Sequence, residues 1–294
     1  MTTKYTLTGY PTTLMGMCLG SDGNIWTCAY NDIINKVTPA GVVSYYSGPS
    51  RSEDVCCLGN GLWITNALVG GISALNISTP GSVTHYTPTS LDTCGVCVGP
   101  DGNIWYTAGS SSAVTYIQAV STSGTLVAGA SLAGFVTNML RLCAGPDGNL
   151  WVTDSGGHIL QVNTSAVALN EYAVGTTPRD ICTGPDGNLW VADYNALVWK
   201  VTTAGVATSY ALSGAEPVAI CKGPDGNLWV ADALHAVWCV TPSGSATKTT
   251  LTGATPKAVC AGADGNIWVL DNAGYVWVIV LSTPKVYVGP LVVG

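Results

Sequence analysis

Short apolar segments separated by turn-forming residues recur along the whole chain. In the unit 178–216, the expected strands are 178–184, 188–192, 197–201 and 206–212. Segments of this length that are rich in Val, Leu, Ile, Trp and Tyr are typical of β-strands, and the Gly, Asn and Asp between them favour hairpins. One such unit therefore predicts a sheet of four antiparallel strands joined by three turns.

The unit is repeated along the chain, and each copy carries a Trp in its second strand. The seven copies have Trp spacings of 37, 42, 46, 39, 39 and 39 residues, and their tryptophans are Trp26, Trp63, Trp105, Trp151, Trp190, Trp229 and Trp268. A period of about forty strand-rich residues is typical of propeller blades. We predict an all-β fold, a seven-bladed β-propeller of four-stranded antiparallel blades, with residues 1–294 forming a single domain.

The motif that precedes each Trp has the residues of a tight hairpin. In blade five, Pro185 and Asp186 suit the central turn positions, and Gly187 tolerates a positive φ. The Trp that follows is a large apolar anchor between blades, and its indole N–H needs an acceptor. We interpret the seven tryptophans as core residues and not as a stacking platform for a ligand.

The chain has 11 cysteines, and one recurs at an equivalent position in every blade. We assign to this series Cys18, Cys57, Cys97, Cys143, Cys182, Cys221 and Cys260. Copies related by rotation about the ring axis are expected to lie too far apart for disulfides, so we interpret them as small buried apolar residues. Cys94 and Cys97 form a lone CxxC without a second ligand pair, which argues against a zinc site.

Composition excludes several functional classes. The net charge is −7 and only 9% of the residues are charged, so a basic surface for nucleic acid is not expected. No apolar run reaches the length of a transmembrane helix, so we expect no membrane insertion. The first residues lack a basic segment followed by an apolar one, so we expect no signal peptide.

Charged residues concentrate on one predicted face of the ring. Strand alternation places the turn after each Trp strand and each blade-to-blade connection on this side, which we call the connection face; the Asp-Gly-Asn hairpins lie on the opposite hairpin face. The connection face takes 14 of the 27 charged residues: Asp32, Arg51, Glu53, Asp54, Asp92, Arg141, Asp154, Arg179, Asp180, Asp193, Glu216, Asp232, Lys257 and Asp271.

The candidate ligand residues lie on the connection face. Four acidic candidates stand three residues after the Trp of blades four to seven: Asp154, Asp193, Asp232 and Asp271. Such an arc of carboxylates suits a cation or a hydroxyl-rich ligand, but each Asp also suits a role as hydrogen-bond acceptor in its own turn. The basic candidates are Arg141, Arg179 and Lys257. Whether the arc holds a metal is left open by the sequence.

The blocks PDGNLWVTD and PDGNLWVAD, which end at Asp154, Asp193 and Asp232, resemble those of the virginiamycin B (streptogramin B) lyase-like propellers. The resemblance extends over all seven repeats. It implies a seven-bladed propeller, and in the lyases it implies magnesium-dependent activity that relies on a His directly after the Pro that opens a blade and a Glu soon after the following Trp. The matching positions after Pro carry Arg179, Val218 and Lys257, and Asp stands after the Trp.

These departures favour a binding or structural propeller without enzymatic activity and without a cofactor. By analogy with lyase-like propellers of phage particles, we expect a virion surface or tail component that mediates host attachment or assembly, with host-surface glycan or other virion proteins as partners. The alternatives are a magnesium-dependent streptogramin lyase-like enzyme, which would need Mg²⁺, and a cellular interaction scaffold located in the cytoplasm.

Both ends of the chain have the pattern of a strand. Residues 3–11 resemble residues 246–253, the fourth strand of blade six, and residues 285–294 are also strand-like. One of the two end segments is expected to complete blade seven. The other is then available to add a further strand or to pair with a second copy in a homo-oligomer.

Overall fold

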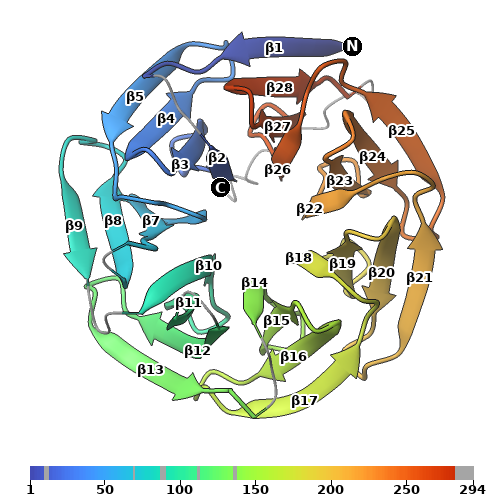
Figure 1. Ribbon diagram of the computed structural model, residues 1–294. Coiled ribbons are helices and arrows are strands. Elements are labelled where there is room, and N and C mark those ends of the chain that lie inside the picture. Colours follow the sequence, from blue (N-terminus) through green and yellow to red (C-terminus); the bar gives the residue numbers. More distant parts are fainter. Residues whose placement is uncertain (10–12, 69, 87–90, 111–112, 135–137, 282–294) are drawn as a thin grey trace, which may run out of the picture.

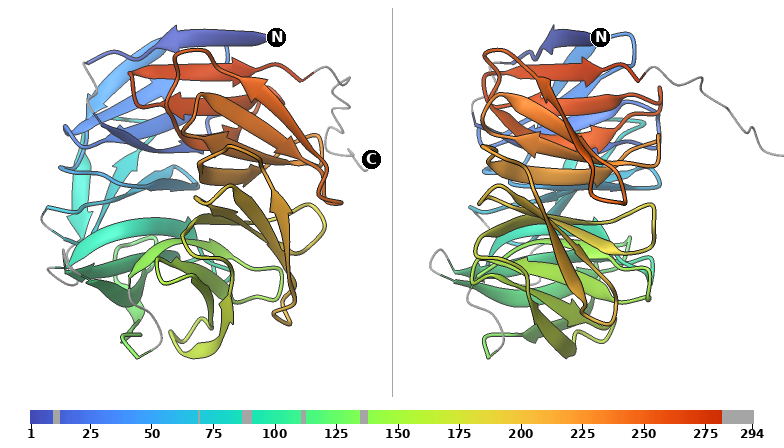
Figure 2. Two further views of the ribbon diagram at one scale, coloured as in Figure 1. Left: turned by 45° about the vertical axis from the view of Figure 1, so that its right-hand side comes forward. Right: turned by 90° about the vertical axis from the view of Figure 1, so that its right-hand side faces the viewer.

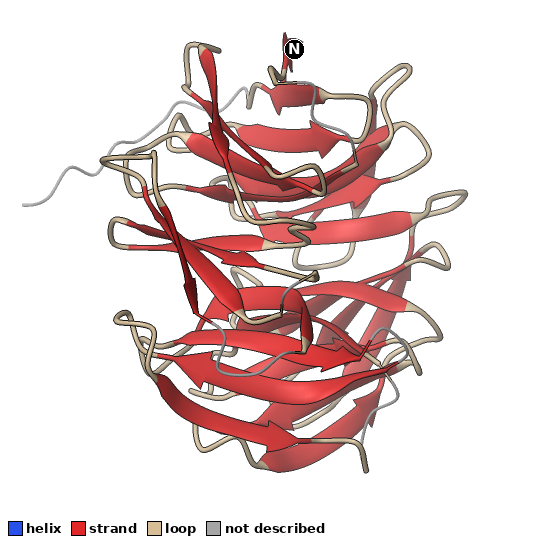
Figure 3. Cartoon of the chain, turned by 60° about the vertical axis from the view of Figure 1, so that its left-hand side comes forward, coloured by secondary structure: helices blue, strands red, loops and turns tan. Residues whose placement is uncertain are grey.

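The computed structural model describes residues 1–9, 13–68, 70–86, 91–110, 113–134 and 138–281. Over these ranges, 28 strands form seven four-stranded antiparallel sheets that are arranged as a ring (Figure 1). The described ranges are built from strands and loops (Figure 3), and none of them forms an apolar helix of membrane-spanning length. The predicted seven-bladed β-propeller is confirmed.

The first four blades follow one another along the chain. Blade one consists of β2 (Leu14–Leu19), β3 (Ile25–Ala29), β4 (Ile33–Val37) and β5 (Val43–Ser47). Blade two consists of β6 (Val55–Leu58), β7 (Gly61–Thr65), β8 (Ile72–Asn76) and β9 (Val83–Tyr86). Blade three consists of β10 (Asp92–Val98), β11 (Ile104–Ser110), β12 (Ala113–Val120) and β13 (Leu126–Ser131). Blade four consists of β14 (Met139–Ala144), β15 (Leu150–Asp154), β16 (His158–Val162) and β17 (Ala168–Ala173).

The last three blades repeat this order, with one exception at the ring closure. Blade five consists of β18 (Pro178–Thr183), β19 (Leu189–Asp193), β20 (Leu197–Val201) and β21 (Ala207–Ala211). Blade six consists of β22 (Pro217–Lys222), β23 (Leu228–Asp232), β24 (Ala236–Val240) and β25 (Ala246–Thr250). Blade seven consists of β26 (Pro256–Ala261), β27 (Ile267–Asp271), β28 (Tyr275–Ile279) and β1 (Thr2–Thr6).

The amino-terminal strand closes the ring. β1 pairs antiparallel with β28, with Thr2 opposite Ile279 and Thr6 opposite Tyr275. This removes the open edge that blade seven would otherwise present. Of the two end segments with a strand pattern, the amino-terminal one therefore completes blade seven; residues 285–294 lie outside the described residues.

One strand of each blade lies innermost, beside the ring axis (Figure 1). It is the first strand of the blade along the chain in blades one to six, and β26 in blade seven. Seen from the side, the molecule is a short cylinder with a turn-bearing face at each end (Figure 2). Each innermost strand starts at the connection face and runs toward the hairpin face, so successive residues of it lie at increasing depth in the central channel.

The tryptophans of the second strands are buried between blades, as predicted. Trp105 and Trp190 are fully buried, and each belongs to an apolar cluster shared with the next blade. The Nε1–H of Trp190 donates to Asp186 Oδ1 at 2.9 Å, and six blades make this bond. In blade two the shorter hairpin has no Asp, and Trp63 Nε1 is buried without a hydrogen-bond partner among the described residues.

The recurring cysteines face the gaps between blades, with one correction in blade two. Cys18 lies opposite Trp26 and Cys97 opposite Trp105, and in blade two it is Cys56 that lies opposite Trp63. The assignment of Cys57 to this series was therefore wrong by one residue, because the blade-two hairpin is one residue shorter. All the cysteines are free, and burial raises the pKa of Cys56 well above its usual value, which fits a packing role.

Candidate functional site

The innermost strands place one residue each around the mouth of the central channel on the connection face. In six of these strands the pairing register shifts near the strand start, for example around Met15, Arg179 and Lys257. A β-bulge of this kind turns a side chain out of the regular alternation, and bulges are frequent beside functional sites. We call the seven residues three positions before the recurring Cys the mouth ring: Met15, Glu53, Cys94, Leu140, Arg179, Val218 and Lys257.

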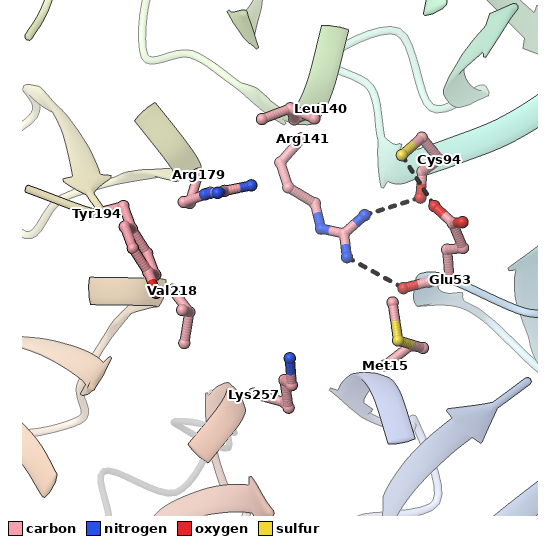
Figure 4. A pocket seen from close by; sticks show the side chains of 9 residues that line it. All are labelled: Met15, Glu53, Cys94, Leu140, Arg141, Arg179, Tyr194, Val218 and Lys257. Atoms are coloured by element: carbon pink, nitrogen blue, oxygen red, sulfur yellow. Dashed lines mark hydrogen bonds between the residues drawn. The ribbon is translucent and has the colours of Figure 1, made fainter. Parts of the chain in front are cut away.

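The mouth ring encloses a pocket of about 430 Å³. All seven residues line it, together with Arg141 and Tyr194 (Figure 4). Pockets of this size hold small molecules, and they typically combine apolar walls with a few polar groups. Here the apolar contribution comes from Met15, Leu140 and Val218, whereas Arg141, Arg179 and Lys257 bring positive charge.

One residue deeper, a second layer carries three charged side chains. This channel layer consists of Gly16, Asp54, Gly95, Arg141, Asp180, Ala219 and Ala258. The small residues are required by the close approach of neighbouring blades: a Cβ on Gly95 would lie 2.6 Å from the carbonyl oxygen of Leu140. A further cavity of about 190 Å³ lies at this level, lined by Asp54, Arg141 and Asp180 among others.

The two aspartates of the channel layer connect neighbouring innermost strands. Asp180 accepts the N–H of Ile181 at 2.9 Å and the N–H of Ile220 in the next blade at 2.8 Å. Asp54 does the same with the N–H groups of Val55 and Val96. Burial raises the pKa of Asp180 to about 6, although the N–H of Ile220 and the charge of Arg141 act in the opposite direction.

Arg141 holds three blades together from the centre of the channel. Its Nη1 donates to the carbonyl oxygen of Cys94 at 2.8 Å and its Nη2 to the carbonyl oxygen of Glu53 at 3.1 Å (Figure 4). Its Nε lies 3.8 Å from Asp54 Oδ2. Burial raises the pKa of Asp54, and Arg141 opposes this rise. The guanidinium is therefore committed to structure and offers the pocket mainly its charge.

Glu53 is turned away from the cations of the mouth. Its Oε1 accepts the hydroxyl of Tyr30 at 2.7 Å, and its Oε2 accepts the thiol of Cys94 at 2.9 Å. Burial raises the pKa of Cys94 to about 12, and Glu53 adds to the rise while Arg141 reduces it. A thiol in this state serves as a hydrogen-bond donor and is a poor nucleophile.

Arg179 and Lys257 are the free cations of the mouth. The Arg179 guanidinium lies 5.1 Å from the ring centroid of Tyr194, whose hydroxyl donates to Glu216 Oε2 at 2.7 Å. Within the described ranges, neither Arg179 nor Lys257 has an acidic partner in ion-pair contact. Figure 4 shows both side chains directed into the pocket from opposite sides of Val218.

The four predicted arc aspartates lie elsewhere. Asp232 is buried, accepts the N–H groups of Glu216 and Leu234 at 2.9 Å each, and accepts Nε1–H of Trp238 at 2.9 Å. Asp193 and Asp271 make equivalent bonds in their own blades, to backbone N–H groups and to the indoles of Trp199 and Trp277. Asp154 accepts the N–H of Asn138, but its blade has Leu160 in place of the indole. None of the four aspartates lines the mouth pocket. These bonds fit the turn role. A ligand-binding role for the arc stays a prediction.

The three histidines also lie outside the mouth pocket. His85 in β9 contacts Ser73 Oγ through Nδ1 at 2.8 Å, His158 lies 3.5 Å from Glu171, and His235 contacts the carbonyl oxygen of Ala254. Over the described part of the chain, no three His, Cys, Asp or Glu residues are grouped so that they could hold a metal ion. The mouth offers cations, a thiol, a phenol and the single carboxylate of Glu53, both oxygens of which already accept hydrogen bonds. These residues do not fit the Mg²⁺ that a lyase would need.

The structure brings together three of the seven residues predicted from sequence and adds six others. Arg141, Arg179 and Lys257 meet at the pocket. The residues that the sequence analysis missed as site residues are Met15, Glu53, Cys94, Leu140, Tyr194 and Val218. A usable signal existed, because the mouth ring stands at a constant distance before the recurring Cys of each blade.

Solved structures with the same fold include lyases and an unrelated propeller. A streptogramin B lyase superposes with a TM-score of 0.86 at 20% identity, over 96% of this chain and 98% of the lyase. Virginiamycin B lyase from Staphylococcus aureus superposes with a TM-score of 0.85 at 20% identity, over 96% and 99%. The WD40 β-propeller domain of Doa1 gives 0.79 at 13% identity, over 96% and 98%. At these identities the likeness establishes the fold alone.

Sequence comparison is more specific. No curated protein sequence matches the chain significantly. The profile of the virginiamycin B lyase family, in contrast, matches residues 127–279, which is more than half of the chain and extends from blade three to blade seven. The chain therefore belongs to the virginiamycin B lyase family.

Proposed function

We propose that this chain is a non-catalytic binding propeller that captures a ligand in the mouth pocket on the connection face. The observation that carries the proposal is the convergence of the mouth ring on one pocket of about 430 Å³ that contains apolar walls and free cations. Binding needs no more than such a complementary cavity. Catalysis would also need an acid, a base or a nucleophile in a reactive state.

The residues of the pocket support binding over lyase chemistry. A histidine-to-alanine variant of virginiamycin B lyase from Staphylococcus aureus, solved with quinupristin, is catalytically inactive. Here the positions after the blade-opening Pro residues carry Arg179, Val218 and Lys257, and no histidine lines the pocket. The one acid of the mouth ring, Glu53, already accepts two hydrogen bonds.

A variant whose mouth pocket is filled by a larger side chain tests the proposal. Val218→Trp is expected to fill the pocket, because Val218 lies between Arg179 and Lys257 in the mouth ring. Val206→Trp is the matched control, since Val206 is 64% exposed on the outer rim. Thermal unfolding is measured for both variants and the unmodified chain with a panel of acidic, basic and neutral small molecules.

Compounds that stabilise the unmodified chain and Val206→Trp, but not Val218→Trp, are the expected result. Equal stabilisation of all three proteins, or none with any compound, would contradict a ligand site at the mouth.

A role in a virion surface or tail, with host-surface glycan or other virion proteins as partners, is a finer proposal that rests on the resemblance to lyase-like propellers of phage particles. The scarcity of charge, at 9% of residues, suits a surface that packs against other proteins. Mass spectrometry of purified particles tests it: a stoichiometric amount of the chain is expected, and its absence would favour a cellular scaffold.

A further inference from the structure

The two free cations of the mouth define a ligand chemistry. Arg179 and Lys257 direct their positive ends into the same pocket from blades five and seven (Figure 4). Like charges that face a shared cavity repel each other, and an anion placed between them removes this repulsion. Arg141 reinforces the positive potential, although its own N–H groups already bind the carbonyl oxygens of Cys94 and Glu53.

Arg179 lies against an aromatic ring and keeps its donors for a planar oxyanion. Its guanidinium carbon lies over the ring of Tyr194, 5.1 Å from the ring centroid, and the hydroxyl of Tyr194 donates to Glu216 Oε2 at 2.7 Å. This cation–π contact uses none of the N–H donors of Arg179 in a hydrogen bond, so they are available to the pocket. A guanidinium edge matches the two oxygens of a carboxylate in a bidentate pair.

The remaining walls limit the charge and the shape of the ligand. Asp54 and Asp180 lie one layer deeper and give the channel below the mouth negative charge, which disfavours a dianion such as a phosphate monoester. Met15, Leu140 and Val218 supply apolar surface around the same pocket. The volume of about 430 Å³ is larger than a bare carboxylate needs.

We propose that the mouth pocket binds a monocarboxylate that carries a small apolar body, with Arg179 and Lys257 on the carboxylate and Met15, Leu140 and Val218 on the apolar part. This inference rests on the proposed binding function and names its ligand class. The pocket selects the anion by charge and binds neutral analogues more weakly, because a neutral group leaves the repulsion between the two cations in place.

Calorimetric titration with three probes tests the inference at pH 8, where Asp180 is ionised. The probes are hexanoate, its neutral isostere hexanamide, and hexyl phosphate. The unmodified chain is expected to bind hexanoate about tenfold more tightly than either of the others, as charge-assisted hydrogen bonds exceed neutral ones. Arg179→Gln and Lys257→Met are each expected to weaken hexanoate binding by about five- to tenfold and to leave hexanamide binding unchanged.

The matched control is Lys222→Gln. Lys222 is an exposed cation at the opposite end of an innermost strand, beside the hairpin face, and its replacement is expected to change none of the three affinities. The melting temperature of each variant verifies that it is folded.

Three results would overturn the inference: equal binding of hexanoate and hexanamide, hexyl phosphate as the tightest probe, or hexanoate binding that survives both substitutions. Failure of the inference is distinct from failure of the proposed function. Hexanamide binding that Val218→Trp abolishes would leave a ligand site at the mouth while removing its preference for carboxylates.

Discussion

Replacing Arg141 by Met is expected to destabilise the ring from its centre. Arg141 makes charge-assisted hydrogen bonds of 2.8 and 3.1 Å to carbonyl oxygens of blades three and two, and lies 3.8 Å from Asp54. The variant leaves both carbonyls and the Asp54 carboxylate without their cation. Removing one partner of a buried pair costs about 3–5 kcal/mol. The side chains of Arg141 and Asp54 keep 22% and 18% exposure, so we expect the lower end, about 3 kcal/mol.

The assay is equilibrium urea unfolding followed by tryptophan fluorescence, with Arg179→Met as the matched control. Arg179 is exposed and donates to no backbone carbonyl of the described residues, so its loss is expected to change the free energy of unfolding by less than about 0.5 kcal/mol. Equal unfolding midpoints for Arg141→Met and Arg179→Met would refute the role of Arg141 in holding the three blades together.

Three further outcomes are expected. Asp101→Ala leaves a buried indole N–H unpaired and should lower the free energy of unfolding by about 1–3 kcal/mol in urea titrations, whereas Asn60→Ala, in the hairpin that lacks this bond, should change it by less than about 0.5 kcal/mol. The pKa of Asp180 is raised to about 6 in the folded state, so protonation of Asp180 stabilises the fold fully below about pH 4, and this contribution is lost as the pH rises through 6. The unmodified chain should therefore lose stability relative to Asp180→Asn between pH 4 and 7 in the same assay. A difference in unfolding free energy between the two proteins that stays constant over this range would contradict the raised pKa. Deleting residues 1–6 exposes the edge of β28 and should lower the melting temperature on the order of 10 °C by calorimetry, with an unchanged value excluding β1 as the closing strand.

The sequence was sufficient for the fold because each blade carries its own local signals. In blade five, the predicted strands agree with β18 to β21 within one residue, since Pro185 to Gly187 and Asn195 mark the turns. The seven Trp positions then set the number of blades. Only the ring closure was ambiguous, because both ends of the chain have the pattern of a strand and local pattern does not reveal which edge a strand pairs with.

The wrong assignment of Cys57 arose because blade two has a shorter hairpin than the other blades, so its residues do not align with theirs at a constant distance from Gly. Blade two has the hairpin Gly59-Asn60-Gly61, one residue shorter than the PDGN hairpins, so counting from the following Gly shifts the series by one. Counting three residues forward from Glu53, or pairing against Trp63, identifies Cys56 instead. A slip of one residue in a strand exchanges its two faces, so the difference decides which blade interface the thiol joins.

The site was predicted only in part, because its residues are related by position in the ring and not by type. Met15, Glu53 and Val218 share no chemistry that would single them out. Their position three residues before the recurring Cys places them at the mouth, and a bulge accompanies it at Met15 and Val218. The arc aspartates, in contrast, share a type and a spacing. In blades five to seven, a Trp stands six residues after the Asp, which was a signal for the indole bonds of Asp193, Asp232 and Asp271.

The central claim is that the mouth of the channel binds a ligand without transforming it. The most direct measurement is incubation of the chain with quinupristin and Mg²⁺, with the remaining quinupristin followed by liquid chromatography coupled to mass spectrometry, which separates isomers, and with the Staphylococcus aureus lyase assayed in parallel. The account predicts intact quinupristin with this chain under conditions where the lyase converts it fully. Conversion of quinupristin at a rate that Val218→Trp abolishes would contradict the account and assign catalysis to the mouth pocket.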